Sequence, residues 1–138
     1  MGMIKYFAYG MNTNLTQMAS RCPTAVCLGP AWIDNYRMVF RGVADIEPAV
    51  NVQCDGVLWE ITDEDLAALD ILEGYPYHYT RFTVLVHSAS GAVPALVYQM
   101  VDQDAEYEPS HYYFDMVHEG YIQNDVPTDQ LFETVELQ

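Results

Sequence analysis

The sequence predicts an α+β fold with a mainly β core, built as a twisted sheet or small barrel, and with flanking helices. Several strand-like segments follow one another directly in the first half of the chain. Strands and helices are mixed but do not alternate regularly, as they would in a doubly wound sheet. The 138 residues are enough for one hydrophobic core. We therefore expect a single domain over residues 1–138.

The N-terminus is predicted to form a strand, a turn and a short helix. Met3–Tyr9 alternates loosely between apolar and polar residues and leads into Gly10, which is typical of a strand that ends in a turn. Asn12 or Thr13 can then cap a helix over Asn14–Ser20.

Consecutive strands are predicted in the next part of the chain. Val26–Ile33 and Tyr36–Arg41 have strand character and are separated by Asp34-Asn35, a dipeptide that favours turns. Ala44–Gln53 is a weaker strand that Pro48 is expected to interrupt, and Gly56–Ile61 is a stronger one.

A helix with clear start and stop signals follows. Thr62 and Asp65 have the spacing of a capping box, and three acidic residues occupy the first turn. Leu66, Leu69 and Leu72 mark one apolar face, and Gly74 suits a left-handed helix stop.

The C-terminal part is predicted to hold a hairpin and two helices. The hairpin pairs Arg81–Val86 with Ala95–Val101 around Ser88–Gly91. One helix is capped by Ser110 and runs to about Glu119, ending at Gly120, and Thr128 caps the last helix, over Asp129–Glu136.

Charge and composition exclude several protein classes. Five Lys and Arg face twenty Asp and Glu, which gives a net charge of −15. The scattered basic residues form no patch that could hold a nucleic acid or an anionic membrane. No apolar run approaches the roughly 18 residues of a membrane span, and the first residues do not form a secretory signal. We expect a cytoplasmic protein, and the sequence leaves monomer and homodimer open.

Cysteine and histidine do not indicate a disulfide framework or a metal site. Cys22, Cys27 and Cys54 are odd in number and lack CxxC spacing, so we expect reduced thiols that act as small core residues. His111 and His118 lie seven residues apart, but no third ligand accompanies them.

Tyr6–Asn12 is the first segment that could form a site. A strand that enters a glycine and then a helix start brings backbone N–H groups together at the positive end of the helix. Such a place suits a carboxylate or a polarised carbonyl oxygen. On the pattern alone, an ordinary strand followed by a tight turn is the favoured interpretation.

The second segment is the helix end at Glu73. This residue lies at the border of the predicted apolar face, where it can point inward. The negative helix end, and the three tyrosines and one proline that follow, should raise the pKa of Glu73 from about 4.3 toward about 6–7, the range of a competent base. A lone glutamate at such a position is ordinarily solvated, so the pattern by itself does not identify a site.

Two neighbours of Glu73 leave alternatives open. Arg81 can bind a substrate carboxylate, but a brace on Asp70 or on the loop is favoured because alternate positions of its strand can face away. His78 can assist proton transfer, although a partly exposed loop residue is the favoured interpretation.

Together these segments resemble the γ-glutamylcyclotransferase family, including its AIG2-like members. Tyr9-Gly10-Met11-Asn12 matches the family's Tyr-Gly-Ser-Asn-type turn. Leu69-Asp70-Ile71-Leu72-Glu73-Gly74 matches its Leu-Asp-x-x-Glu-Gly block, and Tyr79-Thr80-Arg81 matches the Tyr-x-Arg that follows. A late Pro-Ser…Tyr…Gly segment is matched by Pro109-Ser110, Tyr113 and Gly120. The resemblance covers nearly the whole chain in one order.

The resemblance implies a reaction and the residues that perform it. In this reaction the α-amine of a γ-glutamyl group attacks its own γ-carbonyl, 5-oxoproline forms and the attached amine or amino acid leaves, with no metal or organic cofactor. The family's catalytic acid/base falls on Glu73. The residues implied to hold the small γ-glutamyl substrate are Tyr6, Phe7, Ala8, Tyr9, Gly10, Met11, Tyr79 and Tyr113.

Met11 departs from the family pattern, in which a small hydroxyl residue is usual. If that hydroxyl binds substrate, this chain has lost a hydrogen bond and narrowed its pocket; if only the backbone N–H is used, the change is tolerated. Three interpretations follow: a γ-glutamylcyclotransferase-like enzyme, a cyclotransferase for γ-glutamyl-amines, and a non-catalytic module that binds a γ-glutamyl metabolite.

Overall fold

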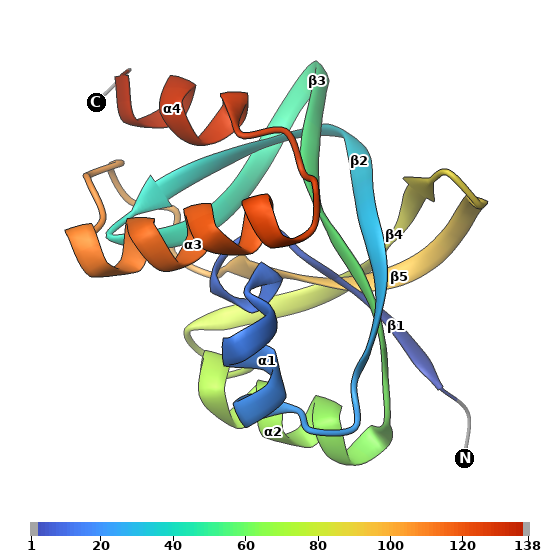
Figure 1. Ribbon diagram of the computed structural model, residues 1–138. Coiled ribbons are helices and arrows are strands. Elements are labelled where there is room, and N and C mark those ends of the chain that lie inside the picture. Colours follow the sequence, from blue (N-terminus) through green and yellow to red (C-terminus); the bar gives the residue numbers. More distant parts are fainter. Residues whose placement is uncertain (1–2, 137–138) are drawn as a thin grey trace.

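The computed structural model describes residues 3–136 and contains a closed five-stranded barrel in the order β1-β3-β2-β4-β5. Figure 1 shows the strands crossing one another as they wrap around the core. β1 pairs antiparallel with β3 and parallel with β5, which closes the barrel. The strands are β1 (Ile4–Ala8), β2 (Val26–Arg41), β3 (Val43–Ile61), β4 (Tyr79–Ser88) and β5 (Gly91–Met100). The predicted α+β fold with a small barrel is confirmed.

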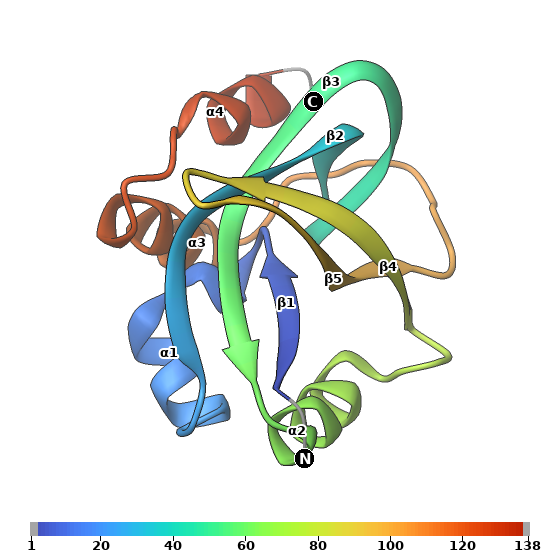
Figure 2. The same cartoon turned by 90° about the vertical axis from the view of Figure 1, so that its right-hand side faces the viewer.

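Helices cover both ends of this barrel. Figures 1 and 2 place α1 and α2 together at one end, and α4 at the other end beside β2. The helical segments are the 3-10 helix η1 (Met11–Thr13), α1 (Leu15–Arg21), α2 (Asp63–Glu73), α3 (His111–Gln123) and α4 (Asp129–Glu136). Within the described residues, no helix is long and apolar enough to cross a membrane.

The helix α2 begins and ends where its sequence signals predict. The Thr62 hydroxyl accepts a hydrogen bond from the Asp65 N–H, the Asp65 carboxylate accepts one from the Thr62 N–H, and both are 3.1 Å long. Gly74 ends the helix in the left-handed conformation, with φ at 67°. The predicted apolar face is wrong at Leu72, which is 47% exposed. The inward face instead carries Asp65 and Leu69, both buried, and Glu73 follows Leu69 by four residues on that face.

The strands of the first half are longer than predicted. Asp34-Asn35 forms a bulge within β2 rather than a turn, because Asn35 takes a left-handed φ of 66° where the pairing with β3 shifts. Pro48 lies within β3 and does not interrupt it. The chain reverses at Gly42, whose φ of 79° suits a glycine. The segments predicted as separate strands therefore form one long hairpin.

Two helix boundaries also differ from the prediction. Asn14, and not Asn12 or Thr13, caps α1, because its side chain accepts hydrogen bonds from two backbone N–H groups of the first turn. Gly120 does not end α3, which continues to Gln123. The hairpin turn between Ser88 and Gly91, the Ser110 cap and the range of α4 agree with the prediction.

Gly120 permits the close packing of α3 against η1. A methyl group at this position would lie 2.3 Å from Thr13 Oγ1 and 2.6 Å from the Asn14 nitrogen. We expect Gly120→Ala to reduce the free energy of unfolding by about 1–3 kcal/mol, because α3 must move away from η1. Urea denaturation measures this loss. Asp115→Ala, at an exposed position of α3, is the control and should change stability by less than about 0.5 kcal/mol; equal stabilities of both variants would contradict the packing role.

The three cysteines are free thiols. Cys22 and Cys54 are buried, as predicted for small core residues, whereas Cys27 is exposed. Within residues 3–136 no group of three or more His, Cys, Asp or Glu side chains is arranged to hold a metal ion.

Candidate active site

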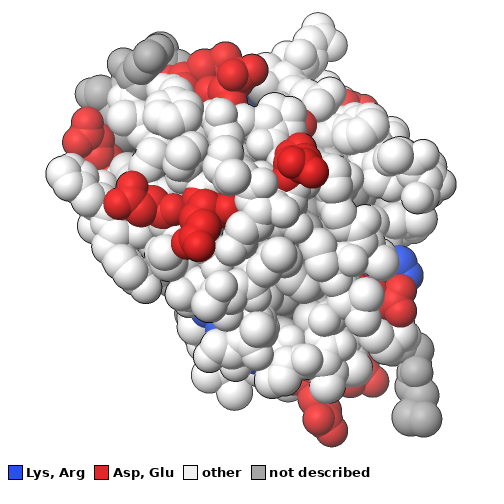
Figure 3. Space-filling view, viewed as in Figure 1, with Lys and Arg blue, Asp and Glu red and all other residues white. Residues whose placement is uncertain are grey.

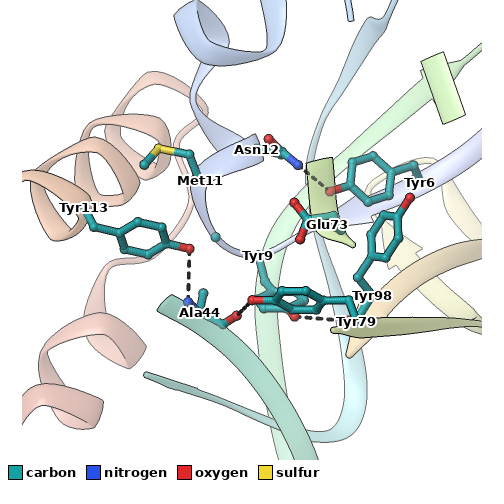
Figure 4. A pocket seen from close by; sticks show the side chains of 10 residues that line it. Tyr6, Tyr9, Met11, Asn12, Ala44, Glu73, Tyr79, Tyr98 and Tyr113 are labelled. Carbon is teal, nitrogen blue, oxygen red and sulfur yellow. Dashed lines mark hydrogen bonds between the residues drawn. The ribbon is translucent and has the colours of Figure 1, made fainter. Parts of the chain in front are cut away.

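A cavity lies where the end of β1 meets η1 and the C-terminal end of α2 (Figure 4). It encloses about 340 Å³ of free space, including its open mouth. Its walls come from both halves of the chain, and the lining residues are Tyr6, Tyr9, Gly10, Met11, Asn12, Ala44, Glu73, Tyr79, Tyr98 and Tyr113. Five of these ten residues are tyrosines, so one carboxylate is surrounded by aromatic rings.

Glu73 brings its carboxylate into the cavity from the last turn of α2. Figure 4 shows the carboxylate beside the Tyr6 hydroxyl, with the ring of Tyr98 on the same side as Tyr6 and the ring of Tyr79 below. Burial raises the pKa of Glu73 to about 7, and the positive charge of Arg21 opposes this shift in part. A carboxylate with such a pKa can both accept and return a proton at neutral pH.

Three tyrosines around Glu73 donate their hydroxyl protons to fixed acceptors. Tyr9 donates to the Tyr98 carbonyl at 2.8 Å, and Tyr79 donates to the Ala44 carbonyl at 2.6 Å. Tyr98 donates to Asp70 at 2.7 Å. These three hydroxyl groups already donate to acceptors within the protein, so the rings act as apolar walls that reduce the hydration of Glu73.

Two other tyrosines accept hydrogen bonds and keep their own protons for another partner. Tyr6 accepts from Asn12 at 3.0 Å, and Tyr113 accepts from the Ala44 N–H at 3.0 Å. The backbone of Met11 also hydrogen bonds to Tyr113, and burial raises the pKa of Tyr113 to about 12. Both hydroxyl groups face the cavity and can donate to an oxygen of a bound molecule.

Gly10 allows the two sides of the cavity to approach each other. A methyl group at Gly10 would lie 2.7 Å from the Ala44 Cβ and 3.3 Å from the Tyr113 hydroxyl. The turn after β1 is therefore more than a chain reversal, because its backbone forms a cavity wall. In Figure 4 the Met11 side chain points toward α3 and away from Glu73.

The cavity gathers most of the residues that the sequence singled out. Glu73 is joined by six of the eight predicted substrate contacts, namely Tyr6, Tyr9, Gly10, Met11, Tyr79 and Tyr113. Phe7 and Ala8 are corrections to the prediction, since neither lines the cavity. Phe7 lies on the opposite face of β1 from Tyr6 and is fully buried beside Gly56, and Ala8 is buried in the pairing with Val57.

Asn12, Ala44 and Tyr98 also line the cavity, although they are not among the predicted substrate contacts. Asn12 lies in the segment Tyr6–Asn12 that the sequence singles out as a possible site. Ala44 and Tyr98 reach the cavity only because the barrel closes, so the residues next to them in the sequence do not indicate that they line a site.

The open alternatives for the two neighbours of Glu73 are also answered. Arg81 forms a two-point ion pair with Asp70, with distances of 2.9 and 3.2 Å, which confirms the bracing role. Asp70 in turn holds Tyr98. His78 is exposed and packs edge-on against Tyr79, and it does not line the cavity.

A buried carboxylate, Asp45, fixes the wall next to Ala44. It is fully buried and accepts hydrogen bonds from Arg41 at 2.9 Å, from the Met100 N–H at 2.8 Å and from Gln103 at 3.1 Å. Because Ala44 bonds to both Tyr113 and Tyr79, Asp45 stabilises the strand segment that positions these two rings.

The surface carries the acidic excess that the sequence implies. Figure 3 shows separate acidic groups on the face that bears α3 and α4, and only small areas of Lys or Arg. No basic patch is visible on this face.

Comparison with solved structures supports the same fold. A structure described as a gamma-glutamyl cyclotransferase matches with a TM-score of 0.86 and 22% identity, over 96% of this chain and 86% of the other. A mouse AIG2-like protein matches with a TM-score of 0.62 and 20% identity, over 82% and 84%. A yeast gamma-glutamyl cyclotransferase specific to glutathione matches with a TM-score of 0.62 and 16% identity, over 99% and 97%.

Sequence comparison is more specific. No curated protein sequence matches the chain significantly. A family model described as gamma-glutamyl cyclotransferase, AIG2-like, matches residues 6–116. This range includes every residue that lines the cavity. The chain is therefore a member of the gamma-glutamyl cyclotransferase, AIG2-like family.

Proposed function

We propose that the protein acts as a single domain, over residues 1–138, and cyclises the γ-glutamyl group of a small substrate to 5-oxoproline. The observation that carries this proposal is the Glu73 carboxylate, which has a pKa of about 7 and lies in a cavity with two hydroxyl donors. Membership of the cyclotransferase family supports the same reaction type.

The proposed reaction begins with proton transfer. The α-amine of the substrate is largely an ammonium group at neutral pH, so Glu73 first removes a proton from it. The free amine then attacks the γ-carbonyl carbon, and a new C–N bond closes the five-membered ring. Because both reacting groups belong to one molecule, a folded bound shape supplies much of the acceleration.

Collapse of the intermediate returns the proton. The bond from the γ-carbon to the leaving nitrogen breaks, and Glu73 gives that nitrogen the proton that it took from the attacking amine. The hydroxyls of Tyr6 and Tyr113 are placed to stabilise oxygen atoms of the substrate, including the oxygen that becomes negative. No step in this scheme requires a further reactant.

The leaving group distinguishes the enzyme candidates. For the first candidate enzyme the leaving group is an amino acid or peptide. For the alternative, an AIG2-like cyclotransferase of γ-glutamyl-amines, the leaving group is an amine such as the ε-amine of lysine. A panel of γ-glutamyl dipeptides, glutathione and γ-glutamyl-ε-lysine, with 5-oxoproline measured by mass spectrometry, separates them. Saturable binding without any 5-oxoproline would instead identify a non-catalytic binding module. Met11 favours this alternative, because it replaces the small hydroxyl residue that is usual in the family.

The activity should depend on the ionisation of Glu73. The base must be deprotonated, and burial raises its pKa to about 7. We therefore expect an acid limb in the pH profile: kcat/KM should fall about tenfold per pH unit below pH 7, and Glu73 should cause no further change above pH 7. A pH–rate profile with the best substrate measures this limb, and an acid limb near pH 4.5 would show that the carboxylate is solvated.

A further inference from the structure

A line of three polar side chains leads from α1 to the cavity. Arg21 Nη1 donates to Asn12 Oδ1 at 2.6 Å, and Asn12 Nδ2 donates to the Tyr6 hydroxyl at 3.0 Å. Asn12 is 5% exposed and Tyr6 is 4% exposed, so water has little access to the hydrogen bond between them, whereas the bond from Arg21 is partly buried. Figure 4 shows the Asn12 amide directed at the Tyr6 hydroxyl, beside Glu73.

The direction of these hydrogen bonds follows from Arg21. A guanidinium group has only donors, so the Asn12 atom that faces it must be the carbonyl oxygen. The amide NH₂ group is then left for Tyr6, whose oxygen must accept. A hydroxyl that accepts in this way has its own proton available for another acceptor, and Tyr6 lines the cavity.

Arg21 also differs from the other basic residues. Lys5, Arg37, Arg41 and Arg81 each pair with a carboxylate. Within residues 3–136, Arg21 forms no ion pair, although the chain carries twenty Asp and Glu. Among the described residues, Arg21 thus uses its side chain for a hydrogen bond to Asn12 and not for an ion pair.

We propose that Arg21 is a positioning residue that fixes the orientation of Asn12, so that the hydroxyl proton of Tyr6 points into the cavity and is donated to an oxygen of the bound γ-glutamyl group. The inference rests on the proposed function for the identity of the bound molecule. The direction of the hydrogen bonds is independent of that function. Tyr6 is the group that touches the substrate, and Arg21 acts through it.

Asn12→Asp reverses the final hydrogen bond with little change in shape. The carboxylate still accepts from Arg21, but it must also accept from Tyr6, so the hydroxyl proton turns away from the cavity. We expect kcat for 5-oxoproline formation to fall about 10–100-fold, as it should for Tyr6→Phe, because a substrate hydrogen bond is lost in both variants. The two changes together should lower kcat no further than either alone.

Further variants separate positioning from folding. Arg21→Gln can face Asn12 with either an oxygen or an NH₂ group and should lower kcat, whereas Arg21→Lys keeps a donor-only head group and should restore part of it. Arg37→Gln, at a partly exposed arginine outside the cavity, is the matched control and should leave kcat unchanged. All rates are compared at pH 8.5, above the acid limb, so that a shifted pKa of Glu73 does not lower them.

Two kinetic results would overturn the inference while leaving the proposed function intact: an Asn12→Asp variant with wild-type kcat, or losses from Asn12→Asp and Tyr6→Phe that multiply. If the wild-type protein forms no 5-oxoproline, the proposed function fails instead. Neutron diffraction then tests the hydrogen-bond direction directly. The Tyr6 deuteron should point into the cavity in the wild type and toward the substituted carboxylate in Asn12→Asp, and the same orientation in both would refute the role of Arg21.

Discussion

Glu73→Gln should lower the turnover of γ-glutamyl substrates by about 10³–10⁴-fold, because the amide keeps the shape of the side chain but cannot carry a proton. Substrate binding should change little, since the walls and the two hydroxyl donors remain in place. Steady-state kinetics with mass-spectrometric detection of 5-oxoproline measures the effect. Retained turnover would remove Glu73 from the mechanism.

The same variant should be more stable than the wild type above neutral pH. Burial raises the pKa of Glu73 in the native state to about 7, above its ordinary value of 4.5. The wild type therefore loses stability as the pH rises from about 4.5 to 7, where the unfolded state releases the proton and the native state still holds it. Above pH 7 this loss is complete, and below pH 4.5 it is absent.

Glutamine carries no such penalty, so we expect Glu73→Gln to gain about 1–3 kcal/mol at pH 8 and nothing at pH 4. Urea denaturation at both pH values gives the difference. Glu64→Gln, at an exposed position of the same helix, is the control and should show no comparable gain. Equal gains for the two variants would show that the Glu73 carboxylate is hydrated in the native state.

Asp45→Ala should destabilise the protein by about 3–5 kcal/mol, the second large effect that we expect. The change leaves the buried Arg41 guanidinium with Glu47 as its one remaining carboxylate partner among the described residues, and it leaves the Met100 N–H without its acceptor. Asp45→Asn keeps an acceptor for Met100 and should lose less. Chemical denaturation ranks the variants.

An exposed acidic residue provides the comparison. Asp34 also has a side-chain partner, His87 Nε2 at 3.2 Å, but the Asp34 side chain is 56% exposed, so Asp34→Ala should change stability by less than about 1 kcal/mol. A loss for Asp45→Ala no larger than that for Asp34→Ala would show that the Asp45 network does not stabilise the cavity wall.

The parts of the fold that were predicted well depend on local signals. Residues Thr62–Gly74 contain a complete capping box and a left-handed stop, so both ends of α2 could be found without the rest of the molecule. The same holds for the turn between Ser88 and Gly91. In contrast, Asn35 was predicted in a turn because local preference cannot distinguish a turn from a bulge that also needs a left-handed residue.

The candidate site was predictable only in part, for a related reason. The position of Glu73 and the direction of its pKa shift follow from the helix end and the tyrosines near it. Ala44 and Tyr98 are placed by barrel closure, and Asp45 by a buried network that involves three other segments. Phe7 and Ala8 show the converse error, because a motif assigns a whole segment although neighbouring strand residues face opposite ways.

β1, near the start of the described chain, and α3, more than 100 residues later in the sequence, meet at the cavity, since Tyr6 and Tyr113 both border it. A fragment that lacks either β1 or α3 would therefore have an incomplete cavity, without Tyr6 or without Tyr113. After dilution from denaturant, the enzymatic rate should therefore recover later than the helix signal in circular dichroism. The recovery of the rate would then report the last step of refolding, in which segments far apart in the sequence come together.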